Sequence, residues 1–234
     1  MAMTTALLNN VDHGGLRVAI RHGAAFGDAV NQMLLLPTEF LEAQREFPIL
    51  FRRSAEGWAA VALLGFDQDE NLFLGEAGWS SRYVPAVQRR GPCLIGRDEA
   101  GEPKVRIALD DPRVGDGAGH PLFLPHGGEA PYLGHVRQAL AQLHAGTEAS
   151  PAMFAAFEAA GLLDEVRLDV EVDAERRYEI EGYWTIGAPT LAALDGDTLA
   201  RLNADGYLAL AFAVVASLGN VERLIELKRM RMPA

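Results

Sequence analysis

Cysteine and positive charge are both scarce in this sequence. Cys93 is the only cysteine in 234 residues, which excludes an internal disulfide and a cysteine-based zinc cluster. Because it lies between Pro92 and Leu94, we interpret it as a small buried hydrophobic residue rather than a reactive thiol. Asp and Glu outnumber Lys and Arg by 32 to 21, for a net charge of −11. This balance argues against nucleic acid as a partner, because phosphate binding needs concentrated Lys and Arg.

Long hydrophobic runs are also missing. The most apolar segment, residues 208–218, is shorter than the ~20 residues that a spanning helix needs, so we expect a buried core helix and no transmembrane segment. The first fifteen residues lack a basic region followed by a long apolar stretch, which is the pattern of a signal peptide. We therefore expect a cytoplasmic protein, with secretion without a signal left open.

The composition is that of an ordinary globular protein. Hydrophobic residues make up 49 % of the chain and charged residues 23 %, which excludes global disorder. Residues 1–30 have weak periodicity and predict a loosely ordered arm. Residues 31–234 predict a single α+β domain: an antiparallel, strand-rich N-terminal half, then helices and a long β-hairpin in the C-terminal half.

Three patterns in the second half define its elements. Residues 166–172 alternate apolar and charged side chains, and 178–186 continue in phase after a turn, which predicts the hairpin. Pro131 suits the first turn of a helix with an apolar stripe at Leu133, Val136 and Leu140. Ser150 and Pro151 predict the start of a second helix.

The chain contains no Walker loop, HExxH or GxSxG motif, and we predict no cofactor and no catalytic residues. His120 and His126 lie in a long loop over residues 110–130 with Glu129 nearby. Imidazole and carboxylate groups could together bind a transition metal there. The competing interpretation is a pair of surface histidines in a mobile loop.

The stretch YVPAVQRRGPCLIG, residues 83–96, combines two prolines, two arginines and the cysteine. Arg89 and Arg90, with Trp79 and Tyr83, could clamp a carboxylate or phosphate. The alternative is that both arginines form internal salt bridges, since acids are plentiful in this chain.

Several blocks, among them LPTEFLEAQREFPILF, VALLGFDQDENLFL, GWSSRYVPAVQRRGPCLIG, IEGYWTI and GYLALAFAVVASLGNVERLIEL, together resemble the SapC family of bacterial proteins. The resemblance covers most of residues 33–227 in order. It implies no established activity and no catalytic residues. It implies an accessory protein of Gram-negative bacteria, associated with TonB-dependent receptors or with a surface layer.

We therefore expect a non-catalytic accessory protein that binds a peptide or partner protein. Two alternatives stay open: a metal- or cofactor-dependent modifying enzyme that uses the His120–Glu129 loop, and a structural protein of the surface layer. A homo-oligomer is also open, because the apolar C-terminal helices could pack against a second copy.

Overall fold

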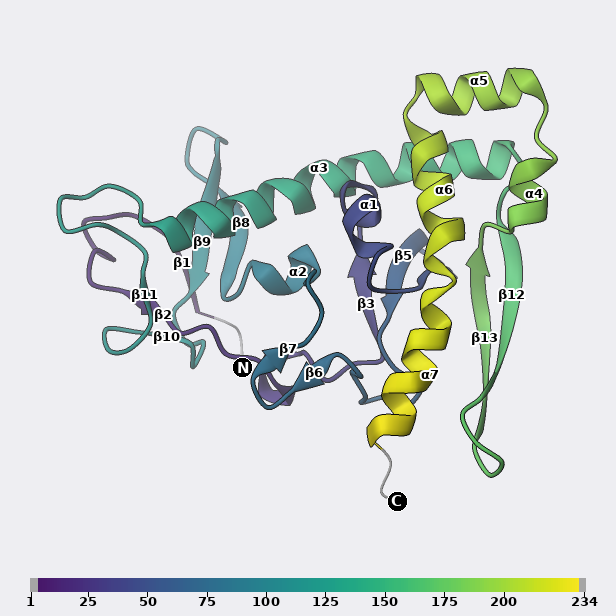
Figure 1. Ribbon diagram of the computed structural model, residues 1–234. Helices are drawn as coiled ribbons and strands as arrows, with labels where there is room; N and C mark the ends of the chain where they lie inside the picture. Colours follow the sequence, from purple (N-terminus) through teal and green to yellow (C-terminus); the bar gives the residue numbers. More distant parts are fainter. Residues whose placement is uncertain (1–3, 232–234) are drawn as a thin grey trace. The chain divides into compact units, whose positions relative to one another are not determined.

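The structure is a computed structural model that describes residues 4–231. All paired strands in it run antiparallel, and helices and sheets are both extensive (Figure 1). The predicted α+β class is confirmed, and the described residues form no closed barrel.

The described chain divides into two compact units. Unit 1 comprises residues 4–22 and 86–144, and unit 2 comprises residues 23–85 and 145–231. Two short strands, β1 (Thr5–Leu7) and β2 (Arg17–Val18), lie within the segment for which the sequence predicts a loose arm. The domain boundary near residue 30 itself stays a prediction.

Unit 1 is built on two small sheets and one helix. Its first sheet has the order β1-β9-β8, with β8 at Cys93–Arg97 and β9 at Pro103–Ala108. In its second sheet β2 lies between β10 (Val114–Gly115) and β11 (His120–Pro121). The short helix α2 (Ala86–Arg89) precedes β8. The core joins these sheets to the first half of helix α3 through eight buried residues: Val18, Cys93, Val105, Ile107, Leu122, Leu133, Val136 and Leu140.

Unit 2 contains a five-stranded sheet of order β12-β13-β4-β5-β3. Its strands are β3 (Gln32–Leu35), β4 (Ile49–Ser54), β5 (Gly57–Leu63), β12 (Asp164–Glu171) and β13 (Arg177–Thr185). The last two form the predicted hairpin, which is thus confirmed. Phe51 lies at the centre of the core and contacts the ring of Phe154 edge to face at 5.1 Å.

The remaining elements of unit 2 are short until the chain reaches its C-terminal helices. They are η1 (Ala24–Phe26), η2 (Pro37–Glu39), α1 (Phe40–Ala43), β6 (Leu74–Gly75), β7 (Gly78–Trp79), α4 (Ala188–Ala192) and α5 (Gly196–Ala204). Helices α6 (Tyr207–Ser217) and α7 (Asn220–Arg231) then follow each other along one line (yellow in Figure 1).

Helix α3 (Pro131–Ala159) is one continuous helix, so the prediction of a second helix starting at Ser150-Pro151 was wrong. Proline removes one helical hydrogen bond and usually marks a boundary. Here the preceding serine remains helical, and its Oγ donates to the carbonyl of Gly146 at 2.8 Å. Gly146 packs so closely that a Cβ there would lie 2.5 Å from Cβ of Leu36. Tertiary packing of this turn therefore outweighs the local cost of Pro151.

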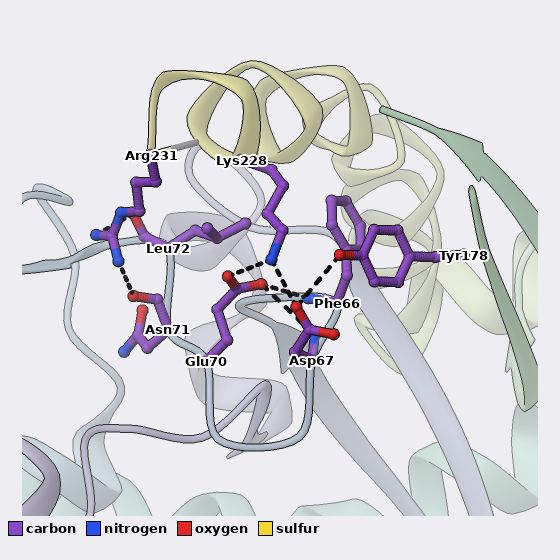
Figure 2. A network of polar contacts seen from close by, with 8 residues as sticks. All are labelled: Phe66, Asp67, Glu70, Asn71, Leu72, Tyr178, Lys228 and Arg231. Carbon is purple, nitrogen blue, oxygen red and sulfur yellow. Dashed lines mark hydrogen bonds and ion pairs between the residues drawn. The ribbon is translucent and has the colours of Figure 1, made fainter. Parts of the chain in front are cut away.

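A polar network holds α7 to the loop before β6 (Figure 2). Lys228, only 9 % exposed, donates to Oδ2 of Asp67 and Oε1 of Glu70, each at 2.6 Å. Arg231 donates to the backbone carbonyls of Asn71 at 3.1 Å and of Leu72 at 2.9 Å. Lys228 and Arg231, both near the end of this helix, therefore bind polar groups of the protein itself.

Burial alone would lower the pKa of Lys228, but its hydrogen bonds to Asp67 and Glu70 outweigh that effect and raise the pKa. Lys228 is therefore charged at neutral pH. By length and composition alone, residues 207–231 form one helix that could cross a membrane, with 28 % of its most apolar window buried. A membrane-spanning state would have to break the ion pairs that Lys228 makes in this structure.

Candidate functional site

The surface of unit 1 has a groove between helix α3 and the β8–β9 hairpin. Arg137, Leu140, Ala141 and His144 line its helical wall. Their spacing of i, i+3, i+4 and i+7 places them on one face of the helix. Ile95 and Val105 form the facing wall and lie directly opposite each other in the hairpin register.

The floor of the groove is apolar because it is the edge of the unit 1 core. Val105 and Leu140 are 7 % and 6 % exposed and belong to that core, whereas Ile95 is 44 % exposed. The groove has a volume of about 280 Å³, just below the range of ~300–1,000 Å³ usual for small-molecule and cofactor sites. Its size fits one or two side chains of a partner better than an entire cofactor.

The rim of the groove is basic. Lys104, Arg137 and His144 surround the apolar floor, in a chain whose net charge is −11. Arg137 forms an ion pair with Glu129 at 2.7 Å, and Lys104 lies 3.6 Å from Asp98. The side chains of Lys104 and Arg137 are half exposed, so their charged ends are within reach of a ligand.

Arg89 and Arg90, which the sequence places in a candidate anion clamp, both lie in unit 1 but outside this groove. Arg90 Nη1 donates to the carbonyl oxygen of Cys93 at 2.8 Å and so closes its own turn. Burial, together with the charge of Arg113, lowers the pKa of Arg90. Arg89 donates to the side-chain oxygen of Gln142 on α3.

Trp79 and Tyr83, the other two residues of that predicted clamp, belong to unit 2. Trp79 Nε1 donates to Oδ1 of the fully buried Asp28 at 2.7 Å. The hydroxyl of Tyr83 donates to Oε1 of Glu39 at 2.8 Å, and Glu39 is fully buried as well. The polar ends of both aromatic residues therefore satisfy buried carboxylates of unit 2.

His120 lies in β11, and His126 lies within the turn that joins β11 to α3. The ring of His120 stacks on Tyr132 at 5.6 Å between centroids, and His126 is exposed. Within residues 4–231, no group of three or more His, Cys, Asp or Glu side chains is arranged to hold a metal ion. Glu129, the carboxylate of the proposed metal loop, pairs with Arg137 instead.

Three titratable groups beside the unit 1 core have shifted pKa values. Burial raises the pKa of the Cys93 thiol to about 12 and that of the Tyr132 hydroxyl to about 12, so the anionic form of each is harder to reach than in an exposed side chain. Burial would also raise the pKa of Asp111, but two hydrogen bonds from Arg113, at 2.9 and 2.7 Å, lower it. A carboxylate bound bidentately in this way is a weak base.

Sequence reasoning missed the groove residues. The i, i+3, i+4, i+7 pattern at Arg137, Leu140, Ala141 and His144 is visible in the sequence, yet nothing local shows that Ile95 and Val105 face it. The signal in the sequence is that the basic residues Arg137 and His144 lie on either side of the apolar Leu140 on one face of the helix.

A family model described as SapC matches residues 8–224 of the chain and so covers nearly all of both units. No curated protein matches the chain, and no solved structure does either.

Proposed function

Because the chain belongs to the SapC family, with no catalytic residues implied by that membership, we propose that it is a non-catalytic binding protein that recognises a segment of a partner protein. The observation that carries the proposal is the groove of unit 1, with its apolar floor at Val105 and Leu140 and its basic rim. An anchoring side chain of the partner enters the groove, and the rim contacts polar groups beside that side chain.

A peptide side chain fits the groove better than an entire cofactor. The volume of about 280 Å³ admits an anchor side chain, whereas cofactors need a larger enclosed site. The groove also includes Ile95 of β8, and β8 is an edge strand of the sheet β1-β9-β8. An edge strand beside apolar pockets is a surface on which extended peptides add to a sheet.

The family resemblance further suggests a partner in a cell-surface or TonB-dependent uptake system, with this protein acting from the cytoplasm. A protein of such a system would then supply the segment that binds in the groove.

Ala141→Glu tests the groove, because Ala141 is exposed and lines its helical wall. The probes are three fluorescein-labelled pentapeptides that share Leu and Phe and differ in polar residues: Asp-Leu-Glu-Phe-Asp, Asn-Leu-Gln-Phe-Asn and Lys-Leu-Lys-Phe-Lys. Fluorescence anisotropy should show at least one of them binding the wild type, and Ala141→Glu should weaken that binding roughly tenfold, as loss of a central contact does.

Ala152→Glu is the matched control, because Ala152 is an exposed alanine of the same helix that does not line the groove. It should bind like the wild type, and circular dichroism should show that both variants are folded. Equal binding by the two variants would contradict the proposal. Loss of binding in Arg89→Ala/Arg90→Ala, with Ala141→Glu unaffected, would instead place recognition at the arginine pair that the sequence highlights.

A further inference from the structure

We propose that the segment bound in the groove carries a carboxylate next to its apolar anchor, and that Glu129 occupies the place of this carboxylate in the free protein. The inference rests on the proposed function and names the class of partner: an apolar–acidic peptide segment. Its starting point is the gathering of Lys104, Arg137 and His144 around one apolar floor.

Charge complementarity argues for an acidic partner. The chain has 32 Asp and Glu against 21 Lys and Arg side chains, so a lysine and an arginine around one small groove, with a histidine beside them, run against its overall composition. Opposite charges across an interface select the partner and speed its association. A guanidinium such as that of Arg137 also binds a carboxylate with two parallel hydrogen bonds.

The local backbone explains how Glu129 reaches Arg137. Residues 123–129 form a tight turn, in which the amide of Leu124 donates to the carbonyl of Gly128 at 2.6 Å. Phe123 and Glu129 form an isolated bridge across this turn. The turn ends just before Pro131, where α3 begins, and so presents the Glu129 carboxylate to Arg137 one turn and a half into the helix.

The ion pair between Glu129 and Arg137 is weak enough to be replaced. Its Nη2–Oε1 distance is 2.7 Å, but the two side chains are 44 % and 51 % exposed. Exposed pairs of this kind contribute little to stability, because water and salt screen them. A ligand carboxylate delivered by an anchored apolar side chain gains from proximity and displaces Glu129 from Arg137.

Glu129→Gln tests the inference, because it removes the competing charge and keeps the size of the side chain. The variant should bind Asp-Leu-Glu-Phe-Asp about two- to fivefold more tightly than the wild type, which is the range expected for one exposed ion pair. Glu99→Gln, in the β8–β9 turn of the same unit, is the matched control for net charge and should bind like the wild type. Arg137→Gln should weaken binding of the acidic peptide more than binding of its amide counterpart.

The outcomes separate this inference from the proposed function. If the acidic and amide peptides bind wild type equally well and both are blocked by Ala141→Glu, the groove binds peptides but the carboxylate inference is wrong. An equal gain in Glu129→Gln and Glu99→Gln would also overturn it, since the effect would then be general charge. If none of the three peptides binds at 1 mM, about the weakest affinity such a complex could have, both proposals fail.

Discussion

The pKa of the Cys93 thiol is raised because the side chain is buried against apolar neighbours, among them Ile107, which lies directly opposite it in the sheet. The charge of Arg90 acts in the other direction but does not overcome burial. The sequence-based interpretation of a small buried hydrophobic residue is consistent with this position. The only thiol of the chain is therefore a poor nucleophile in the folded protein.

The raised pKa of Cys93 predicts a loss of stability in alkali. Below the ordinary pKa of 9.0, the thiol is protonated in both folded and unfolded chains; between 9.0 and about 12, only the unfolded chain releases its proton. Stability that is fully present below pH 9.0 is thus lost as the pH rises toward 12. From pH 7.5 to pH 10, urea unfolding should show the wild type losing about 1–2 kcal/mol more than Cys93→Ala.

Tyr132, whose pKa is raised mainly by burial and to a smaller extent by Cys93, titrates in both proteins, so the larger, burial-dependent part of its contribution cancels in that comparison. Equal losses for wild type and Cys93→Ala would show that the thiol is already accessible to water in the folded chain.

The hydrogen-bond partners of Trp79 and Tyr83 could not be predicted from the residues that neighbour them in the sequence. Both residues were predicted to contact a ligand because they flank a pair of arginines. In the structure their polar ends donate to Asp28 and Glu39, which lie 51 and 44 residues away in sequence, and ligand contact by the two residues stays a prediction. A buried carboxylate needs hydrogen-bond donors, but the sequence does not show which carboxylates become buried.

Strands with alternating patterns are the elements that could be predicted. β12 and β13 combine alternation with a short turn, and they appear as expected. They also contain a bulge beside Gly182, whose φ of +77° favours glycine. The short apolar run that begins at Leu72 does not form a strand before Leu74, because the Asn71 side chain accepts from the amide of Phe73 at 2.9 Å and closes a turn. Asparagine competes with sheet pairing in this way, so a short apolar run beside it is ambiguous.

Two glycines of helix α3 give a matched test of how closely this helix packs before Pro151. A Cβ at Gly146 would lie 2.5 Å from Leu36 Cβ and 2.8 Å from Thr38 Oγ1, whereas at Gly134 it would meet nothing within 4 Å. Gly134→Ala should stabilise the protein by about 0.5–1 kcal/mol through helix propensity. Gly146→Ala should destabilise it by about 1–3 kcal/mol through overpacking.

Chemical denaturation of both variants measures these changes. If Gly146→Ala were stabilising as well, the close approach of α3 to Leu36 would not exist in solution, and the continuity of the helix would need another explanation.

At the scale of the whole chain, the C-terminal helix bears on the question of a membrane. Residues 207–231 are apolar and long enough to span one, yet Lys228 of this segment is nearly buried between two carboxylates (Figure 2). Lys228→Met should leave Asp67 and Glu70 without a counterion and destabilise the protein by about 2 kcal/mol. The measurement is urea unfolding of the detergent-free protein.

Arg177→Met is the control, because the Arg177–Glu171 pair is exposed on both sides and should contribute less than about 0.5 kcal/mol. If Lys228→Met were as stable as the wild type, the network would not hold α7, and the helix would be available for other contacts.

The fold class and the family could be predicted from the sequence, because both follow from patterns within contiguous segments. The groove could not, since it joins Ile95 and Val105 to Arg137 and His144 across more than thirty residues. Nothing in either segment alone marks it as half of a binding surface. The division of α3 between two compact units is likewise a property of the complete fold.

Binding of an apolar–acidic peptide in the groove of unit 1 is tested most directly by an NMR titration of the ¹⁵N-labelled protein with the peptide Asp-Leu-Glu-Phe-Asp. The largest amide shifts should cluster at Ile95, Val105 and Ala141, and at the same peptide concentration Ala141→Glu should reduce them strongly. Shifts confined to Arg89 and Arg90, or the same groove shifts persisting in Ala141→Glu, would contradict binding in the groove.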